Sequence, residues 1–244
     1  MSLFYGAKIE KTKKLGGNEV HVGYFNGQVV AAVRNGKLTI MNERLVIMKE
    51  FAGTTRDIRS LCGNATYLAI CDLGGFVRYY KKNSSVHSYY TSHKHDDKAN
   101  SVQVKNNLVI SGSSDNTVQV WNMERHEKLW EFDHGHSVWS IILRDDQVIT
   151  CCQDKSVRVL SLESGEELHR LEHLSRCFNA DLNPNKSVLA VGCGEGVVFW
   201  DARNAVKIEQ FDLGTRVHDL RFNQSGDKLI VGLADGQVFK FDIE

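Results

Sequence analysis

The chain is 244 residues long, a length that suits one large all-β domain, and 42% of its residues are hydrophobic. Its 30 Lys and Arg balance its 30 Asp and Glu, which argues against nucleic acid or an acidic membrane as the main partner. The sequence has no apolar run of about 18 residues and no apolar leader at its start. We therefore expect neither a membrane span nor a secretory signal.

A bulky side chain recurs about every 40 residues along the chain. In chain order its occurrences are Met41, Tyr80, Trp121, Leu160, Trp200 and Phe241. The same turn position precedes each of them and holds Asn35, Gly74, Asp115, Asp154, Glu195 and Asp235. The turn at Glu195 is one residue shorter than the others. A period of this length is typical of four-stranded propeller blades.

The third copy shows the unit most clearly. We expect its strands at residues 99–104, 108–112, 117–121 and 128–132. The turn inside residues 111–122, SGSSDNTVQVWN, contains Asp115 and Asn116, which tolerate tight turns by bonding their own backbone. The strand after this turn is apolar on both faces, which indicates a sheet packed between two neighbouring sheets.

These patterns predict an all-β fold, a six-bladed β-propeller of four-stranded antiparallel blades in a single domain spanning 1–244. The expected blades are residues 15–51, 52–90, 91–132, 133–171 and 172–211, with a sixth formed by 212–244 plus 4–12. The last copy stops after its third strand, and a strand pattern around residues 7–11 could supply the fourth. We therefore expect the N-terminal strand to complete the last blade and close the ring, which removes exposed edges.

The cysteines occur in no C-x-x-C pair, and most lie inside apolar, strand-like runs: Cys62, Cys71, Cys151, Cys152, Cys177 and Cys193. We expect buried free thiols, which are typical of a reducing compartment. The expected localisation is therefore cytoplasmic or nuclear.

The stretch SGSSDNTVQVWN, with Gly135-His136 after it and Trp200-Asp201 further on, resembles the WD-repeat β-propeller family. The resemblance covers the whole chain and is strongest in the third to fifth copies; some blades resemble those of F-box/WD-repeat ubiquitin-ligase substrate receptors. It implies a structural hydrogen-bond network in each blade. The residues at the matching positions are His95, Ser111, Asp115 and Trp121, then His136, Thr150 and Asp154, then His173, Glu195 and Trp200, and finally Asp235. Leu160 replaces the Trp in the fourth copy.

The resemblance also implies a binding face around the central opening, with two positions per blade. Early in the first strand the matching residues are Arg59, Asn100, Trp139, Phe178 and His218, and just before the turn they are Arg34, Ser114 and Gln153. Trp139 and Phe178 come from consecutive blades and should be neighbours, and Arg34 should converge with Arg59. Aromatic residues beside arginines are typical of interface hot spots, and arginine suits an acidic or phosphorylated peptide.

Motifs for catalysis or metal binding are weak in this sequence. The cluster His93-Lys94-His95-Asp96-Asp97 could bind a metal, but a surface loop leading into the third blade explains it better. No G-x-S-x-G elbow and no phosphate-binding glycine loop occurs. We therefore expect no enzyme activity, no metal and no cofactor.

The expected function is a non-enzymatic scaffold that binds a peptide or protein loop on one propeller face. The alternative is a substrate receptor of a cullin-type ubiquitin ligase that reads an acidic or phosphorylated degron, although no F-box-like segment precedes the strands. A propeller enzyme is less favoured. The expected partner is a protein or peptide, not nucleic acid or membrane, and the chain alone is expected to be monomeric.

Overall fold

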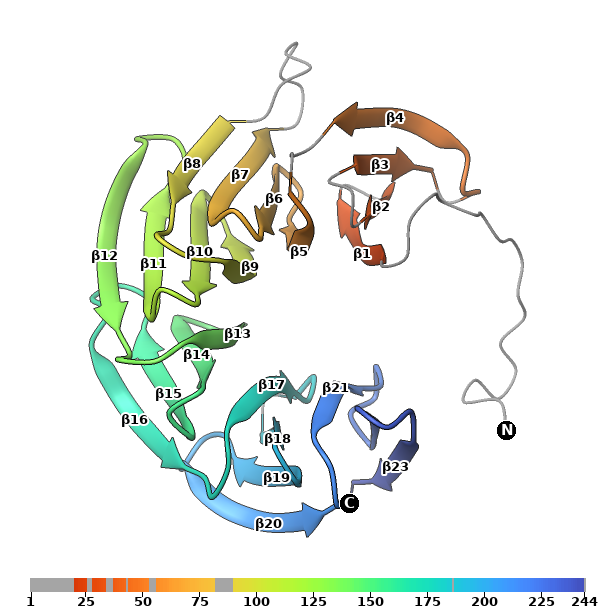
Figure 1. Ribbon diagram of the computed structural model, residues 1–244, viewed down its shortest axis with the longest axis vertical. Coiled ribbons are helices and arrows are strands. Elements are labelled where there is room, and N and C mark those ends of the chain that lie inside the picture. The colour runs from red at the N-terminus through yellow and green to blue at the C-terminus, as the bar shows by residue number, and fades with distance from the viewer. Residues whose placement is uncertain are drawn as a thin grey trace.

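The computed structural model describes residues 20–25, 28–33, 37–42, 44–52, 56–81, 90–185 and 187–243. Its regular elements are all β-strands, arranged in six antiparallel sheets (Figure 1). Among these residues no helix is long and apolar enough to cross a membrane.

The first three sheets each contain four strands. Sheet one has β1 (Val20–Phe25), β2 (Gln28–Val33), β3 (Lys37–Met41) and β4 (Ile47–Ala52). Sheet two has β5 (Ile58–Gly63), β6 (Tyr67–Asp72), β7 (Phe76–Lys81) and β8 (Tyr90–Lys94). Sheet three has β9 (Ala99–Lys105), β10 (Leu108–Ser113), β11 (Thr117–Asn122) and β12 (Glu127–Asp133).

The last three sheets repeat this order, but the sixth has only three strands. Sheet four has β13 (Val138–Arg144), β14 (Gln147–Cys152), β15 (Ser156–Ser161) and β16 (Glu167–Glu172). Sheet five has β17 (Cys177–Leu182), β18 (Val188–Cys193), β19 (Gly196–Asp201) and β20 (Val206–Asp212). Sheet six has β21 (Val217–Phe222), β22 (Lys228–Leu233) and β23 (Val238–Asp242).

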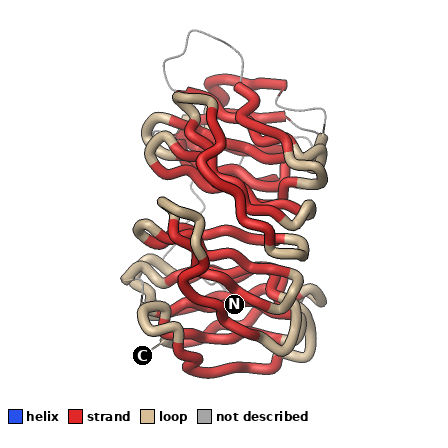
Figure 2. The backbone as a smooth tube through the Cα atoms, turned by 90° about the vertical axis from the view of Figure 1, so that its left-hand side faces the viewer, coloured by secondary structure: helices blue, strands red, loops and turns tan. Residues whose placement is uncertain are grey.

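The sheets follow one another along an arc, with the first strand of each on the inside (Figure 1). Neighbouring inner strands contact each other in the order β1, β5, β9, β13, β17 and β21. Seen from the side, the strands run across the thickness of the molecule and most turns gather at its two faces (Figure 2). Residues at the same strand end in different sheets therefore meet on the same face.

Each pair of consecutive sheets encloses one hydrophobic cluster. Ile58 and Leu68 pack against Val30 and Leu38 between sheets one and two, and the interfaces from sheet two to sheet six are filled in the same way. The clusters form because the middle strands carry apolar side chains on both faces. The core is thus divided into layers between the sheets, as the repeat predicts.

The third sheet shows how the sequence produces the local structure. Its strands begin and end within two residues of the expected ranges. The Asp115 carboxylate accepts a hydrogen bond from the amide of Thr117 (2.9 Å), and Ser113 Oγ accepts one from the amide of Asp115 (3.0 Å). Asn116 has a φ of 78°, a conformation that Asn tolerates better than most residues. These side chains fix the tight turn between β10 and β11.

Two expectations about the sheets need comment. The second sheet includes β8 up to Lys94, so it ends later than the expected boundary at residue 90. The N-terminal strand expected to complete the last blade, residues 4–12, lies outside the described residues. Within the described part, sheets one and six are the two ends of the arc (Figure 1).

Candidate functional site

The inner strands share a local irregularity at their second residue. The strand register skips this residue in sheets two to six, which is the mark of a β-bulge. The skipped residues are Arg59, Asn100, Trp139, Phe178 and His218. A bulge redirects its side chain out of the regular alternation of the sheet. The early first-strand positions expected from the sequence are therefore the bulged positions.

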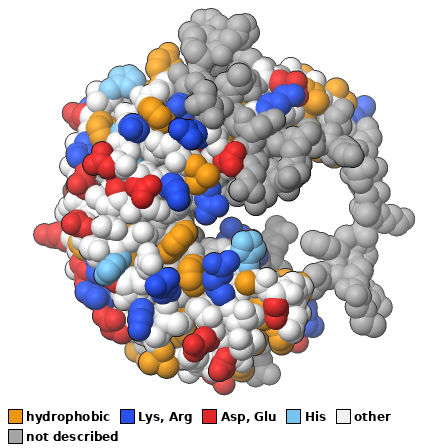
Figure 3. Space-filling model, viewed as in Figure 1, with side chains coloured by type: hydrophobic (Ala, Val, Ile, Leu, Met, Phe, Trp, Pro, Cys, Tyr) orange, Lys and Arg blue, Asp and Glu red, His pale blue; other side chains and the backbone are white. Residues whose placement is uncertain are grey.

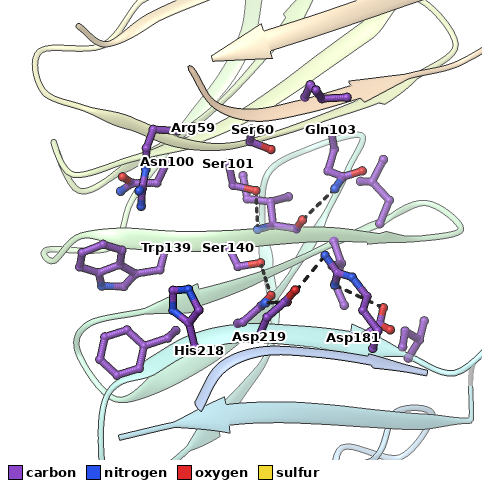
Figure 4. A pocket seen from close by; sticks show the side chains of 18 of the residues that line it. Arg59, Ser60, Asn100, Ser101, Gln103, Trp139, Ser140, Asp181, His218 and Asp219 are labelled. Carbon is purple, nitrogen blue, oxygen red and sulfur yellow. Dashed lines mark hydrogen bonds and ion pairs between the residues drawn. The ribbon is translucent and has the colours of Figure 1, made fainter. Parts of the chain in front are cut away.

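The bulged residues line one cavity of about 860 Å³ in the centre of the arc. Its walls are the inner strands β5, β9, β13, β17 and β21. Arg59, Asn100, Trp139 and His218 lie at one end of this cavity, and Gln103 and Asp181 lie towards the other (Figure 4). The end that carries Trp139 and Arg59 is called the bulge mouth below.

The aromatic rings of the bulge mouth pack together. The centroids of Trp139 and Phe178 are 5.9 Å apart, and the rings are tilted by 53°. The guanidinium carbon of Arg216 lies 5.1 Å from the Phe178 centroid, within the range of a cation–π interaction. Sequence analysis missed Arg216, which precedes β21. Only the fold shows that it reaches the ring of another sheet.

Polar atoms in the bulge mouth are left without partners. Trp139 Nε1 and Arg59 Nε are shielded from solvent, and neither has a hydrogen-bond partner among the described residues. An unpaired buried donor destabilises the fold by about 1–3 kcal/mol. Hydrophobic and basic side chains lie next to each other along the edge of the central opening (Figure 3). The mouth therefore offers aromatic surface and positive charge together.

The deeper wall of the cavity is polar and ties neighbouring sheets together. Ser140 Oγ donates to Asn179 Oδ1 (3.2 Å), and the Asn179 amide donates to the Asp219 carboxylate (Figure 4). Ser101 Oγ accepts from the backbone amide of Ile141 (3.1 Å). Burial raises the pKa of Asp181, which also accepts a hydrogen bond from the amide of Phe222. These bonds hold the wall rigid beneath the mouth.

The positions expected just before the turns lie elsewhere. Arg34 is outside the described residues, so its expected convergence with Arg59 stays a prediction. Ser114 does not line the cavity, but its Oγ accepts a hydrogen bond from Asn100 Nδ2 (3.0 Å). Asn100 also donates to the carbonyl of Val138 (2.9 Å), so it is held in place. Gln153 does not line the cavity either.

The blade network of the third sheet is assembled from both sides of the turn. His95 Nδ1 donates to the Asp115 carboxylate (2.8 Å), and His95 Nε2 lies 2.8 Å from Ser111 Oγ. Burial by itself would raise the pKa of Asp115, but the hydrogen bond and charge of His95 outweigh it and lower that pKa below its usual range. The network therefore holds Asp115 ionised.

His93 also joins this network, although the resemblance implies only His95, Ser111, Asp115 and Trp121 in the third copy. His93 Nε2 lies 2.7 Å from Ser111 Oγ, and its ring stacks on Trp121 with centroids 4.9 Å apart. The indole Nε1 of Trp121 donates to Gln119 instead (2.9 Å). Burial lowers the pKa of His93 well below its ordinary value. Trp121 thus supports the network through ring packing.

The buried histidine of the fourth sheet is not the expected one, and neither of its ring nitrogens has a hydrogen-bond partner among the described residues. His134 is buried, whereas His136 is exposed. The reason is spacing, because His134 lies as far after His95 as His173 lies after His134. Asp154 forms an ion pair with Arg158 (2.6 Å), and Thr150 Oγ1 donates to the carbonyl of Arg158 (3.3 Å).

The fifth and sixth sheets keep only parts of the network. The His173 ring packs near Trp200, with centroids 5.3 Å apart, and Glu195 is exposed on its turn. Asp235 is also exposed and accepts a hydrogen bond from the amide of Gln237 (3.0 Å). The cysteines carry no disulfide; Cys62 is half-buried and the other five are buried.

Comparison with known proteins identifies the repeat. Residues 84–122 match the family model described as "WD domain, G-beta repeat". The crystal structure of the computationally designed Ika8 protein is similar in fold, with a TM-score of 0.79 and 19% identity over 91% of this chain and 70% of that chain. No curated protein sequence matches the chain. Residues 84–122 are therefore a WD40 repeat, set in repeated antiparallel sheets that are consistent with a WD-repeat β-propeller.

Proposed function

We propose that this protein is a non-enzymatic scaffold that binds a protein or peptide at the bulge mouth. WD40 repeats generally mediate protein–protein interaction, which supports the coarse statement. The observation that supports the site is the group formed by Trp139, Phe178 and Arg216 at the rim of the cavity. Trp and Arg are the side chains most enriched in interface hot spots.

The chemistry of the mouth favours an acidic segment as the ligand. Arg59 and Arg216 place positive charge on either side of the aromatic pair, and a guanidinium can bind two carboxylate or phosphate oxygens at once. A loop or extended peptide could place one apolar side chain against Trp139 and Phe178. The role of ubiquitin-ligase substrate receptor and the cytoplasmic or nuclear localisation stay predictions.

The test compares partners captured by the wild-type chain, a Trp139→Ala/Arg216→Ala variant and an Arg125→Ala control. Arg125 is exposed on the turn after β11, at the opposite ends of the strands. Affinity purification and mass spectrometry would identify partners, and fluorescence anisotropy would measure peptides from them. We expect the Trp139→Ala/Arg216→Ala variant to bind a partner peptide about 30-fold or more weakly than the wild type, as for the loss of a hot spot.

The control and the thermal melts decide the interpretation. Trp139 is half-buried, so its replacement could also destabilise the fold. The variants must therefore unfold at temperatures close to that of the wild type. A partner set that is unchanged in the double variant, or lost equally in Arg125→Ala, would place binding on another surface. Phosphorylated and unphosphorylated versions of the same peptide would show whether the arginines read a phosphate.

A further inference from the structure

A second group of reactive side chains lies in the fifth sheet, away from the bulge mouth. It consists of His173, Cys177 and Cys193, whose ligand atoms all lie within 4.8 Å of one another. Cys177 begins β17, Cys193 ends β18, and the two residues are direct partners across these antiparallel strands. His173 follows β16, and its amide donates to the carbonyl of Lys155 (2.9 Å).

The distances suit a tetrahedral metal ion. Cys193 Sγ lies 3.4 Å from His173 Nδ1. With bonds of about 2.3 Å to sulfur and about 2.0 Å to nitrogen, neighbouring ligand atoms in a tetrahedral zinc site are roughly 3.5–3.8 Å apart. Strand pairing already sets the spacing of the two thiols, so only side-chain rotation is needed to bring the three atoms around one ion.

The two thiols make only long contacts with backbone carbonyls, Cys177 Sγ with Ser175 (3.9 Å) and Cys193 Sγ with Val191 (3.8 Å). His95 in the third sheet is satisfied by Ser111 and Asp115, but Val191 stands at the position of Ser111 in the fifth sheet. His173 Nε2 is shielded and has no hydrogen-bond partner among the described residues. Among the described residues, His173 therefore has no hydrogen bonds that correspond to those of His95 with Ser111 and Asp115.

A similar group in the fourth sheet is already committed to other bonds. His134, Cys152 and Asp154 also lie close together. The Asp154 carboxylate pairs with the Arg158 guanidinium at 2.6 Å, and the Cys152 thiol donates to the carbonyl of His136 (3.3 Å). A buried guanidinium beside the ligands repels a cation, so this group serves as an internal comparison.

We propose that His173, Cys177 and Cys193 bind one zinc ion through Nδ1 and two thiolates. Two thiolates and an imidazole are ligands that zinc accepts, and three protein ligands leave a fourth position for water. Binding releases the two thiol protons, and the two thiolates then balance the charge of Zn²⁺ in this buried place.

Co²⁺ gives a direct readout of this site. Reduced, metal-free protein is titrated with Co²⁺, and we expect the visible and near-ultraviolet bands of tetrahedral thiolate-bound cobalt, saturating at one equivalent. Zn²⁺ should remove the bands and raise the melting temperature. Cys177→Ser and Cys193→Ser should each weaken binding by more than about 100-fold, since losing even an outer-shell partner costs 10–100-fold. His173→Gln should weaken it as well.

Matched cysteine variants serve as controls. Cys62→Ser changes a half-buried thiol in the second sheet, and Cys152→Ser changes the comparison group in the fourth. Both should keep the bands and their stoichiometry, and melts in chelator would show that every variant folds. A reduced, folded wild type without bands would overturn the proposal. So would bands that persist in Cys177→Ser or Cys193→Ser, or a Cys177–Cys193 disulfide in a protein that binds no metal once reduced.

Discussion

Burial of the His134 side chain contributes to the response of this protein to acid. Burial first, and then the charge of Arg158, lowers the pKa of His134 to about 3 from the ordinary value of 6.5. Below pH 6.5 the unfolded chain binds a proton at this residue that the folded chain does not. The contribution of the neutral ring to the free energy of unfolding is therefore complete above pH 6.5, and it is lost as the pH falls from 6.5 towards 3.

We expect the variant His134→Phe to lose part of the pH dependence of the free energy of unfolding. One pKa unit corresponds to about 1.4 kcal/mol, so the contribution of His134 across this range is on the order of a few kcal/mol. Urea denaturation of wild type and variant at several pH values between 6.5 and about 4 measures it. His136→Phe is the matched control, because His136 is exposed. A flattened profile in the control alone would show that His136 is the buried histidine.

At the scale of elements, the outer strand β12 of the third sheet contacts a turn of the fourth sheet. Trp130 of β12 donates its indole Nε1–H to the carbonyl of Leu162, in the turn after β15 (2.8 Å). Gly165 in the same turn has a φ of +77° and lies under this ring. A Cβ at Gly165 would lie 2.8 Å from a carbon of the Trp130 ring. The contact therefore needs glycine for two reasons, backbone conformation and space.

We expect Gly165→Ala to destabilise the protein more than Gly214→Ala. Gly214 has a φ of +74° with nothing within 4 Å of its Cβ position, so it reports the cost of the backbone conformation alone. The additional overpacking against Trp130 should cost about 1–3 kcal/mol. Denaturant melts of both variants, repeated in a Trp130→Ala background, measure the coupling. Equal losses at the two glycines would mean that the turn moves away from the ring without cost.

For the whole molecule, the sixth sheet differs from the other five, because it lies at one end of the described arc and has three strands. The sixth sheet carries Lys240 where the other third strands carry buried Ile40, Tyr79, Val120, Val159 and Phe199. Lys240 is exposed and pairs with Asp242 (3.3 Å). One face of this sheet carries Lys240 together with Ile230 and the exposed Val238, while its other face packs Leu229, Val231 and Phe239 against sheet five.

The sequence predicts that the N-terminal segment pairs with the edge of the sixth sheet. If so, deleting residues 1–14 should accelerate amide hydrogen exchange in β23 first and lower the melting temperature, because an unpaired edge strand is easily opened. Amides of β15, in the middle of sheet four, should stay protected and serve as the internal reference. Unchanged exchange in β21–β23 would show that the three strands of the sixth sheet are stable without the N-terminal segment.

The sequence by itself determined the repeat, the strands and the layered core. These features depend on short-range patterns, such as the turn at Asp115 and alternating apolar residues, and they need no knowledge of distant contacts. The second residues of the inner strands were expected from the resemblance to the WD-repeat family, and the structure shows a bulge at each of them in sheets two to six.

Only the tertiary structure decided which side chains meet. Arg216, next to the sixth sheet, reaches Phe178 of the neighbouring fifth sheet, and His173 lies beside Cys177 and Cys193. The members of these two groups come from different strands and meet through strand register and the packing of consecutive sheets, whereas the buried position of His134 follows the spacing that it shares with His95 and His173. A short motif can predict a strand or a turn, but the distance between two side chains on different strands is set by the assembled fold.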